Sequence, residues 1–254
     1  MDKYLTLRKK LKNREKVTGA SFALFHDTSI LSRIDERFDL DFILFDTEHG
    51  VFDTTNLIPS LSTMRLLGIP SIVRVEDAKY NLVAKVIDMG ADGIMIPRVE
   101  SIEQVQTAID GLYFPPIGKK GLGGHGQMRR GETFNEFHKT RFLYPQIESL
   151  KGIELLPEIL EKYHKYIGAV VVGPYDLSAT MGIPFQFQNP DHIAAVKKVF
   201  DIAKEHGVSA GIFCDDEIKA KFYHDLGANF LWLGLDREYL LRGLKEMIDG
   251  TKDL

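Results

Sequence analysis

Short apolar runs alternate with longer segments of helical periodicity along this chain, and the alternation repeats eight times. Strands and helices that alternate in this way form parallel sheets, because each helix carries the chain back to the start of the next strand. Eight such units in 254 residues predict an α/β fold, a closed (β/α)8 TIM barrel, as a single domain over residues 1–254. A doubly wound open sheet is the alternative, since periodicity does not show whether a sheet closes.

The predicted strands are short and apolar, and the predicted helices place their apolar residues on one face. The strands are Val17–Leu24, a run inside Asp41–Gly50, Pro70–Val75, Gly93–Val99, Arg141–Glu148, Ala169–Gly173, Ser209–Cys214 and Phe230–Leu235. The helices include Ile30–Phe38, Asn56–Leu67, Tyr80–Met89, Ile102–Leu112, Gly152–Tyr163, Asp191–His206 and Tyr239–Ile248.

One connection, residues 115–131, is too long and too rich in glycine for an ordinary loop of a barrel. Three roles are possible for this segment. Its glycines would let backbone amides approach an anion, or its four basic residues would hold a phosphate or nucleic acid, or it would form a flexible lid. It fits neither the Walker A spacing nor a GxGxxG turn that directly follows a strand. The basic residues are too few to predict nucleic-acid binding. We therefore expect a glycine-rich active-site loop.

Polar residues gather where the predicted strands end, which is where barrels carry their chemistry. Two carboxylates on neighbouring strand ends, Glu148 and Asp176, suit a hard divalent cation such as Mg²⁺ or Mn²⁺. The alternative is that Glu148 pairs with Arg74 or Arg141 and that Asp176 caps a turn. No lysine follows a predicted strand directly, which argues against Schiff-base chemistry.

Two further strand-end residues suggest catalysis. Arg74 ends an apolar strand, where its guanidinium would bind the carboxylate of an acidic substrate, or would form an internal salt bridge to Asp46 or Glu48. His49 would act as a general base near neutral pH, or would only cap the turn that follows the second strand.

Composition limits the location and partners of the protein. A net charge of −4 gives no reason to expect nucleic acid as a partner. The single cysteine, Cys214, suits a reducing compartment, and Met1 to Lys16 lack the apolar region of a signal peptide. No run approaches the roughly 18 apolar residues that cross a bilayer. These features predict a cytoplasmic protein without a membrane partner.

Six motifs then occur in order between about residues 17 and 236: FDTEHG, IVRV, VIDMGADGIMIP, PPIGKKGLGG, QIES and GPYDLSA. Together they resemble the HpcH/HpaI aldolase family, the class II, metal-dependent pyruvate aldolases of the phosphoenolpyruvate/pyruvate barrel superfamily. The resemblance implies an aldolase or C–C lyase that cleaves or forms a 4-hydroxy-2-oxo acid through a pyruvate enolate. It implies a divalent metal (Mg²⁺ or Mn²⁺, with Co²⁺ as a further option), no organic cofactor and a homo-oligomer, a hexamer.

The resemblance also implies roles for individual residues. Glu148 and Asp176 would hold the metal, and His49 would be the acid/base, oriented by Asp88 of the VIDMG motif. The residues expected at the bound pyruvate or in support of the site are Arg74, Gln146, Gly173, Pro174, Tyr175, Asp46 and Glu48.

The chain departs from the family pattern on the side of the electrophile. Tyr175 stands where the GPADLSA form of the motif has alanine, and Phe213 stands where smaller residues are common. The segment after the glycines holds His125, Gln127, Met128 and two arginines in place of small residues. Two alternatives therefore remain: a specialised biosynthetic condensing enzyme that forms citrate, as in siderophore synthesis, or a catalytically degenerate binding barrel.

Overall fold

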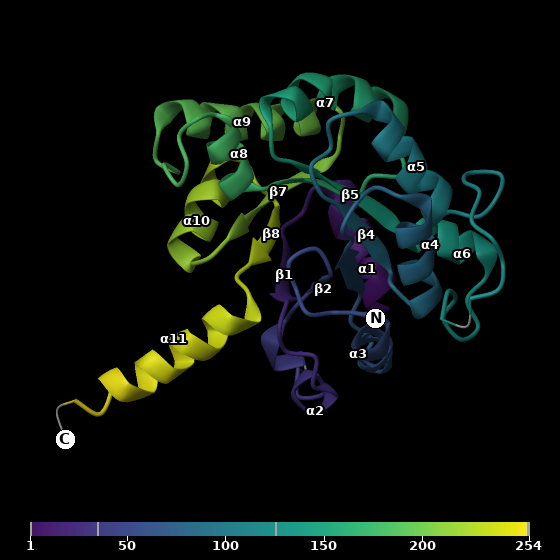
Figure 1. Ribbon diagram of the computed structural model, residues 1–254, viewed down its shortest axis with the longest axis horizontal. Coiled ribbons are helices and arrows are strands. Elements are labelled where there is room, and N and C mark those ends of the chain that lie inside the picture. Colours follow the sequence, from purple (N-terminus) through teal and green to yellow (C-terminus); the bar gives the residue numbers. More distant parts are fainter. Residues whose placement is uncertain (1, 35, 125, 253–254) are drawn as a thin grey trace.

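Eight parallel strands form a closed barrel in which neighbours in sequence are neighbours in space and β8 returns to pair with β1 (Figure 1). The structure is a computed structural model that describes residues 2–34, 36–124 and 126–252. The predicted TIM barrel is thereby confirmed. The strands are β1 Val17–Phe22, β2 Phe42–Asp46, β3 Ser71–Arg74, β4 Gly93–Ile96, β5 Phe142–Ile147, β6 Ala169–Val172, β7 Ser209–Cys214 and β8 Phe230–Leu233.

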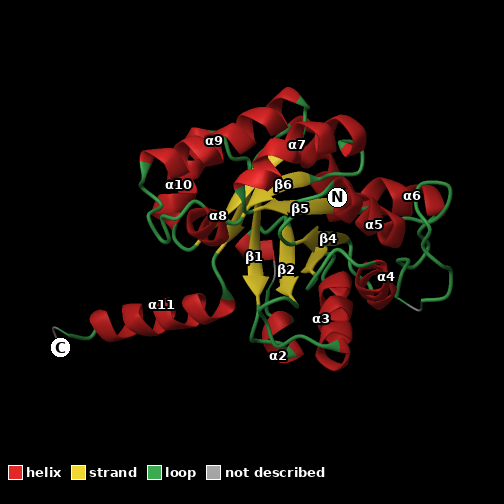
Figure 2. Cartoon of the chain, turned by 45° about the horizontal axis from the view of Figure 1, so that its top comes forward, coloured by secondary structure: helices red, strands yellow, loops and turns green. Residues whose placement is uncertain are grey.

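Helices cover the outside of the strands (Figure 2). Those on the first half of the chain are α1 Lys3–Asn13, α2 Thr28–Leu31, the short 3-10 helix η1 Glu36–Phe38, α3 Thr54–Leu66, α4 Tyr80–Met89 and α5 Ile102–Leu112. Those on the second half are α6 Phe134–Thr140, α7 Leu150–Tyr163, α8 Pro174–Thr180, α9 Pro190–Glu205, α10 Glu217–Leu226 and α11 Asp236–Asp249. No helix in the described ranges is long and apolar enough to span a bilayer.

The predicted helix Ile30–Phe38 is wrong, because two short pieces, α2 and η1, stand in its place. Among the residues of this segment whose burial is described, Leu31 and Ile34 alone lie in the core, too few contacts to stabilise a longer helix. Helices α1 and α6 were not predicted from the sequence.

The barrel interior is filled with side chains and closed at the end where the strands begin. Leu7 and Leu11 of α1 belong to the same apolar cluster as the interior residues Phe42 and Phe230. The rings of Phe42 and Phe230 stack with centroids 4.6 Å apart. A Cβ at Gly19 would lie 2.3 Å from the Phe42 ring, so this tight packing requires glycine there. The interior therefore leaves room for a site only at the opposite end, where the strands finish.

The glycine-rich loop between α5 and α6 is anchored to the flank of the barrel. Lys120 is buried and forms an ion pair with Asp88, and the backbone amide of Gly126 donates to the Asp88 carbonyl at 2.8 Å. Arg129 pairs with Asp92 at 3.0 Å. His125 lies outside the described residues, and none of the described loop residues lines the cavity at the strand ends.

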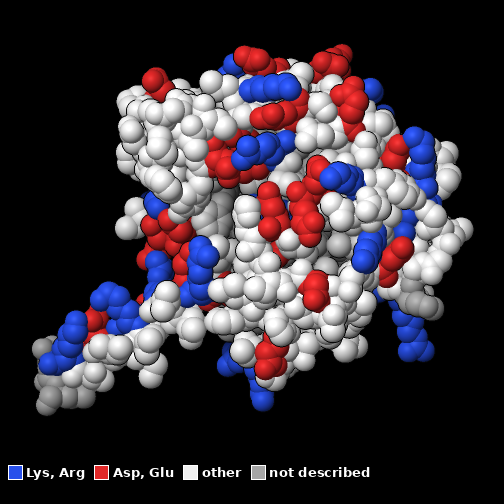
Figure 3. Space-filling model, in the orientation of Figure 1, with Lys and Arg blue, Asp and Glu red and all other residues white. Residues whose placement is uncertain are grey.

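Helix α11 leaves the barrel and projects away from it (Figures 1 and 2). Its first turn is fixed, because the buried carboxylate of Asp236 accepts hydrogen bonds from the amides of Ala23, Leu24 and Phe25 at 2.6–3.0 Å. Beyond that turn, Figure 3 shows charged side chains along one side of the helix and uncharged surface along the other. The exposed apolar side chains are Leu240, Leu241, Leu244, Met247 and Ile248.

Candidate active site

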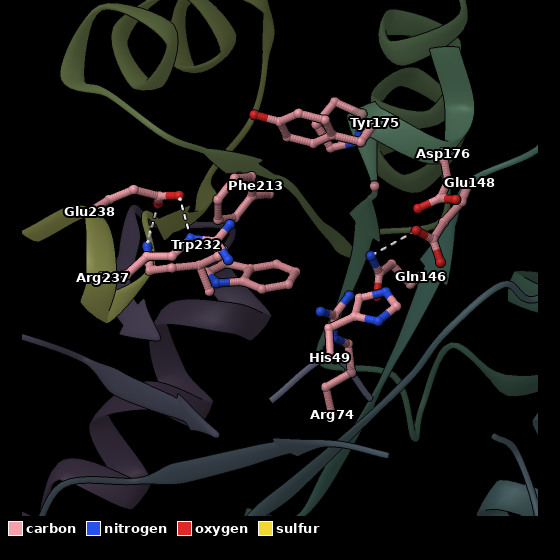
Figure 4. Close-up of a pocket in the computed structure, with 13 residues that line it drawn as sticks. His49, Arg74, Gln146, Glu148, Tyr175, Asp176, Phe213, Trp232, Arg237 and Glu238 are labelled. Atoms are coloured by element: carbon pink, nitrogen blue, oxygen red, sulfur yellow. Dashed lines mark hydrogen bonds and ion pairs between the residues drawn. The ribbon is translucent and has the colours of Figure 1, made fainter. Parts of the chain in front are cut away.

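A cavity of about 300 Å³ opens at the C-terminal ends of the strands (Figure 4). It brings together eight residues that the sequence predicts for the site and five others, among which Phe213 was noted as a departure from the family pattern. The first group is His49, Arg74, Gln146, Glu148, Gly173, Pro174, Tyr175 and Asp176, and the second is Phe213, Trp232, Leu235, Arg237 and Glu238.

Arg74, at the end of β3, is fixed by two carboxylates from the end of β2. Its Nε lies 2.9 Å from Asp46 Oδ1 and its Nη2 lies 2.6 Å from Asp46 Oδ2, a bidentate pair buried from solvent. Its Nη1 lies 3.1 Å from Glu48 Oε2. The internal salt bridge that the sequence left open is thus present, and the same guanidinium also lines the cavity.

His49 follows this pair on the turn after β2. Asp46 shapes the turn, because its Oδ1 accepts from the amides of Glu48 at 3.1 Å and His49 at 3.3 Å. The imidazole is mostly exposed, with Nε2 3.8 Å from Glu48 Oε2. His49 is therefore held at its backbone while its ring faces the cavity (Figure 4).

Glu148 is a carboxylate buried at the floor of the cavity. It accepts hydrogen bonds from the Arg98 amide at 2.8 Å and from Gln146 Nε2 at 2.9 Å. Burial, with a smaller contribution from the charge of Asp176, raises the pKa of Glu148 to about 7. A Cβ at position 173 would lie 2.1 Å from Glu148 Oε2, so Gly173 makes the space that this carboxylate occupies.

Asp176, in the first turn of α8, lies beside Glu148 on the same side of the cavity and is partly exposed (Figure 4). Its Oδ1 lies 2.9 Å from Arg98 Nη2. Arg98 has a φ of 43°, a strained value for a residue with a side chain, and it bridges the two carboxylates through its amide and its guanidinium. Arg98 lies at the end of a predicted strand, and this position could have marked it as a site residue, but no role was predicted for it from the sequence.

These residues fit a hard divalent cation. Within the described residues, no group of three or more His, Cys, Asp or Glu side chains is arranged to hold a metal. Mg²⁺ sites commonly use only one or two carboxylates and leave the other positions to water and substrate. The buried and poorly neutralised Glu148 beside Asp176 supplies such a pair, and the buried Oε1 of Gln146 has no hydrogen-bond partner.

Asp88 was predicted to orient His49, but within a single chain the two residues do not lie together. It forms an ion pair with Lys120 and lines a different cavity with Arg65 and Lys85. The reason is the direction of α4, which runs back against the strands, so that residues near its C-terminus lie far from the strand ends.

Comparisons with known proteins agree with this fold and give its family. The model of the family described as HpcH/HpaI aldolase/citrate lyase matches residues 24–242. A 5-keto-4-deoxy-D-glucarate aldolase of Klebsiella pneumoniae is 29% identical over 216 residues, 84% of each chain. A hydroxypyruvate/pyruvate aldolase of Pseudomonas aeruginosa is 29% identical over 212 residues, 82% of this chain and 78% of that protein. The crystal structure of an HpcH/HpaI aldolase from Desulfitobacterium hafniense superposes with a TM-score of 0.86 at 29% identity, over 98% of this chain and 97% of that one.

A (β/α)8 barrel with a charged cavity at its strand ends, matched by aldolases over most of its length, defines an enzyme of the aldolase or lyase class. The chain belongs to the HpcH/HpaI aldolase/citrate lyase family.

The raised pKa of Glu148 predicts a stability effect in metal-free protein. Its folded pKa of about 7 exceeds the ordinary 4.5, so stability falls as pH rises between these values and the loss is complete above pH 7. Glutamine carries no charge at either pH, so Glu148→Gln removes this loss. The effect of the substitution on the free energy of unfolding is therefore expected to be more stabilising at pH 8 than at pH 4, by up to about 3 kcal/mol. Urea unfolding with EDTA at both pH values measures it, and an equal effect at the two would contradict the assignment.

Proposed function

We propose that this protein is a metal-dependent aldolase that interconverts a 4-hydroxy-2-oxo acid with pyruvate and an aldehyde. The observation that carries the proposal is the buried Glu148 carboxylate beside Asp176, with the fixed guanidinium of Arg74 in the same cavity. Aldolase relatives over most of the chain support the reaction class. The free, buried Cys214 suits the reducing conditions of the cytoplasm, where we place the protein.

Glu148 and Asp176 would hold a divalent cation, Mg²⁺ or Mn²⁺, which when bound supplies Lewis-acid stabilisation of charge on the oxygens of the oxo acid. Arg74 and Gln146 would bind the pyruvate moiety beside it. Arg74 presents a cation that Asp46 and Glu48 keep in one orientation, and Gln146 presents an amide whose Oε1 is unpaired. Gly173 and Pro174 would line the site of the substrate carboxylate.

In the cleavage direction, His49 takes the proton of the C4 hydroxyl as the general base. The C3–C4 bond breaks, its electron pair passes to the pyruvate enolate, and C4 leaves as the aldehyde carbonyl. Protonation of the enolate at C3 gives pyruvate. No oxidant or reductant is needed, and the condensation follows the same steps in reverse.

Loss of either proposed ligand is expected to remove the metal. Glu148→Gln and Asp176→Asn should each weaken Mn²⁺ binding by more than the roughly 10- to 100-fold that the loss of an outer partner costs. Isothermal titration calorimetry measures the affinity, and Glu161→Gln, at an exposed position of α7, is the control. Unchanged affinity in both ligand variants would refute the assignment.

Enolate formation can be tested without knowing the aldehyde. With pyruvate and Mg²⁺ or Mn²⁺ in D₂O, we expect the pyruvate methyl protons to exchange for deuterium, because enolisation makes C3 basic. NMR follows the exchange, and EDTA should stop it. A lack of exchange with every divalent metal would overturn the aldolase proposal and would favour the degenerate binding barrel.

His49→Asn should retain the affinity for Mn²⁺ and lower aldol turnover by about 100-fold or more, the usual range for a general base. Calorimetry reports the first property and steady-state cleavage the second. Turnover close to wild type would show that another group moves the proton.

We also propose that the protein is a homo-oligomer, a hexamer as the family resemblance implies, in which α11 packs on a second copy. Its exposed apolar residues repeat at positions 240, 241, 244, 247 and 248, which lie on one face of a helix. Helix α11 stands away from its own barrel (Figure 1), and these side chains are exposed.

Leu241→Asp combined with Leu244→Asp is expected to convert the oligomer to smaller species, because charge on this face opposes burial. Light scattering after size-exclusion chromatography measures the mass. Glu246→Ala on the same helix is the control, and an unchanged mass in the double variant would exclude α11 from the interface.

A further inference from the structure

The cavity has two chemically different sides. Arg74, Glu148 and Asp176 form an ionic side, to which the proposed function assigns pyruvate and metal. Tyr175, Phe213 and Trp232, which we call the aromatic wall, stand on the other side (Figure 4). The following inference rests on the proposed function, because it concerns the second reactant that would meet pyruvate in this cavity.

The aromatic wall is a continuous surface built from three elements. Phe213 of β7 lies 5.0 Å from Trp232 of β8, centroid to centroid and nearly edge to face, and 6.1 Å from Tyr175 of α8. The ring of Phe187 also packs against Tyr175, with the two ring centroids 5.0 Å apart. Such spacings are those of favourable ring pairs, so the three rings support one another in place.

Polar contacts at both ends of the aromatic wall fix its orientation. The Tyr175 hydroxyl donates to Asp215 Oδ2 at 3.0 Å, and Lys219 holds the same carboxylate at 2.6–2.7 Å. Burial and the charge of Asp215 raise the pKa of Tyr175 to about 12, so the phenol remains a neutral donor. At the other end, the guanidinium of Arg74 lies 5.1 Å from the Trp232 ring.

Two rings of the aromatic wall, Tyr175 and Phe213, leave apolar surface uncovered, whereas Trp232 is buried with the interior rings. Phe42 and Phe230 are fully buried, whereas Tyr175 is 39% exposed and Phe213 is partly exposed at the cavity. Exposed rings inside a hollow gain free energy when a ligand covers them. A hydroxylated ligand would gain little there, because it would lose hydrogen bonds to water that ring faces do not replace.

The charged residues on this side are Arg237 and Glu238, at the rim. Their side chains lie 3.4 Å apart and neutralise each other, and Glu238 also accepts from the Leu235 amide at 2.9 Å. The rim is therefore close to neutral, although the exposed guanidinium of Arg237 stays accessible to an anion. The apolar rings are what an incoming electrophile would contact.

We propose that the second reactant is an aromatic aldehyde, whose ring packs on the uncovered surface of Tyr175 and Phe213, beside Trp232, and whose carbonyl carbon points toward the ionic side. In the condensation, C3 of the pyruvate enolate attacks that carbon. The carbonyl oxygen takes a proton and becomes the C4 hydroxyl of a 4-aryl-4-hydroxy-2-oxo acid.

Binding can be measured directly, because Trp232 is the only tryptophan of the chain. With Mg²⁺ and pyruvate present, unreactive benzyl alcohol is expected to change the Trp232 fluorescence saturably, and glycerol at equal concentration is expected to leave it unchanged. Phe213→Ala should weaken benzyl alcohol binding about tenfold or more, since it removes the central ring of the wall. Phe134→Ala, an exposed ring on α6, is the matched control. Equal responses to the two alcohols would overturn the proposal.

Kinetics give the second test. Wild-type protein should condense pyruvate with benzaldehyde at a higher kcat/KM than with glyceraldehyde, and Phe213→Ala should reduce this preference about tenfold or more while Phe134→Ala preserves it. A preference for glyceraldehyde, or one that Phe213→Ala leaves unchanged, would overturn the aromatic-aldehyde proposal. Pyruvate methyl exchange by the wild-type protein separates the two levels: exchange without benzaldehyde preference removes only this inference, and absence of exchange removes the aldolase proposal with it.

Discussion

The buried ion pair between Arg74 and Asp46 is the contact around which the site is arranged. It ties the ends of β2 and β3 together through two parallel hydrogen bonds in a place that water does not reach. Asp46 also accepts from the amide of His49, so one carboxylate positions both a cation and an imidazole. Through the ring of Trp232, the same guanidinium touches the aromatic wall. Pyruvate binding, proton transfer and electrophile binding would therefore depend on the geometry of a single pair.

Glu148 shows the opposite use of a buried charge. Where Arg74 is compensated by Asp46 and Glu48, Glu148 receives two hydrogen bonds and remains costly to ionise. Ionisation of such a group lowers the stability of the metal-free protein, and a bound cation would compensate its charge. Arg98 partly neutralises the neighbouring Asp176, and a bound cation would compete with its guanidinium for that oxygen.

The sequence predicted those parts of the fold and site that depend on local pattern. Eight apolar runs predicted the closed barrel, and strand ends predicted most of the cavity lining, because parallel strands bring their ends to one rim. The predicted pairing of Asp88 with His49 is not found within one chain, since a motif position does not show at which end of the barrel a helix residue lies. Trp232 was missed because the sequence indicates only an apolar strand residue at this position. Its place in the cavity lining follows from the pairing of β8 with β7. The projection of α11 was not predicted, because periodicity gives the apolar face of a helix but not its direction relative to the barrel.

Gly173 limits how this cavity can vary. Any side chain there would have its first carbon 2.1 Å from the Glu148 carboxylate, so even alanine would expel the carboxylate from its position. Tyr175, two residues later, has its ring partly in solvent and no such restriction. Under the proposed function, the side chain at position 175 could therefore vary where the one at position 173 could not. At the start of α8, a position that the proposed chemistry requires would thus stand two residues from one that could alter the choice of aldehyde.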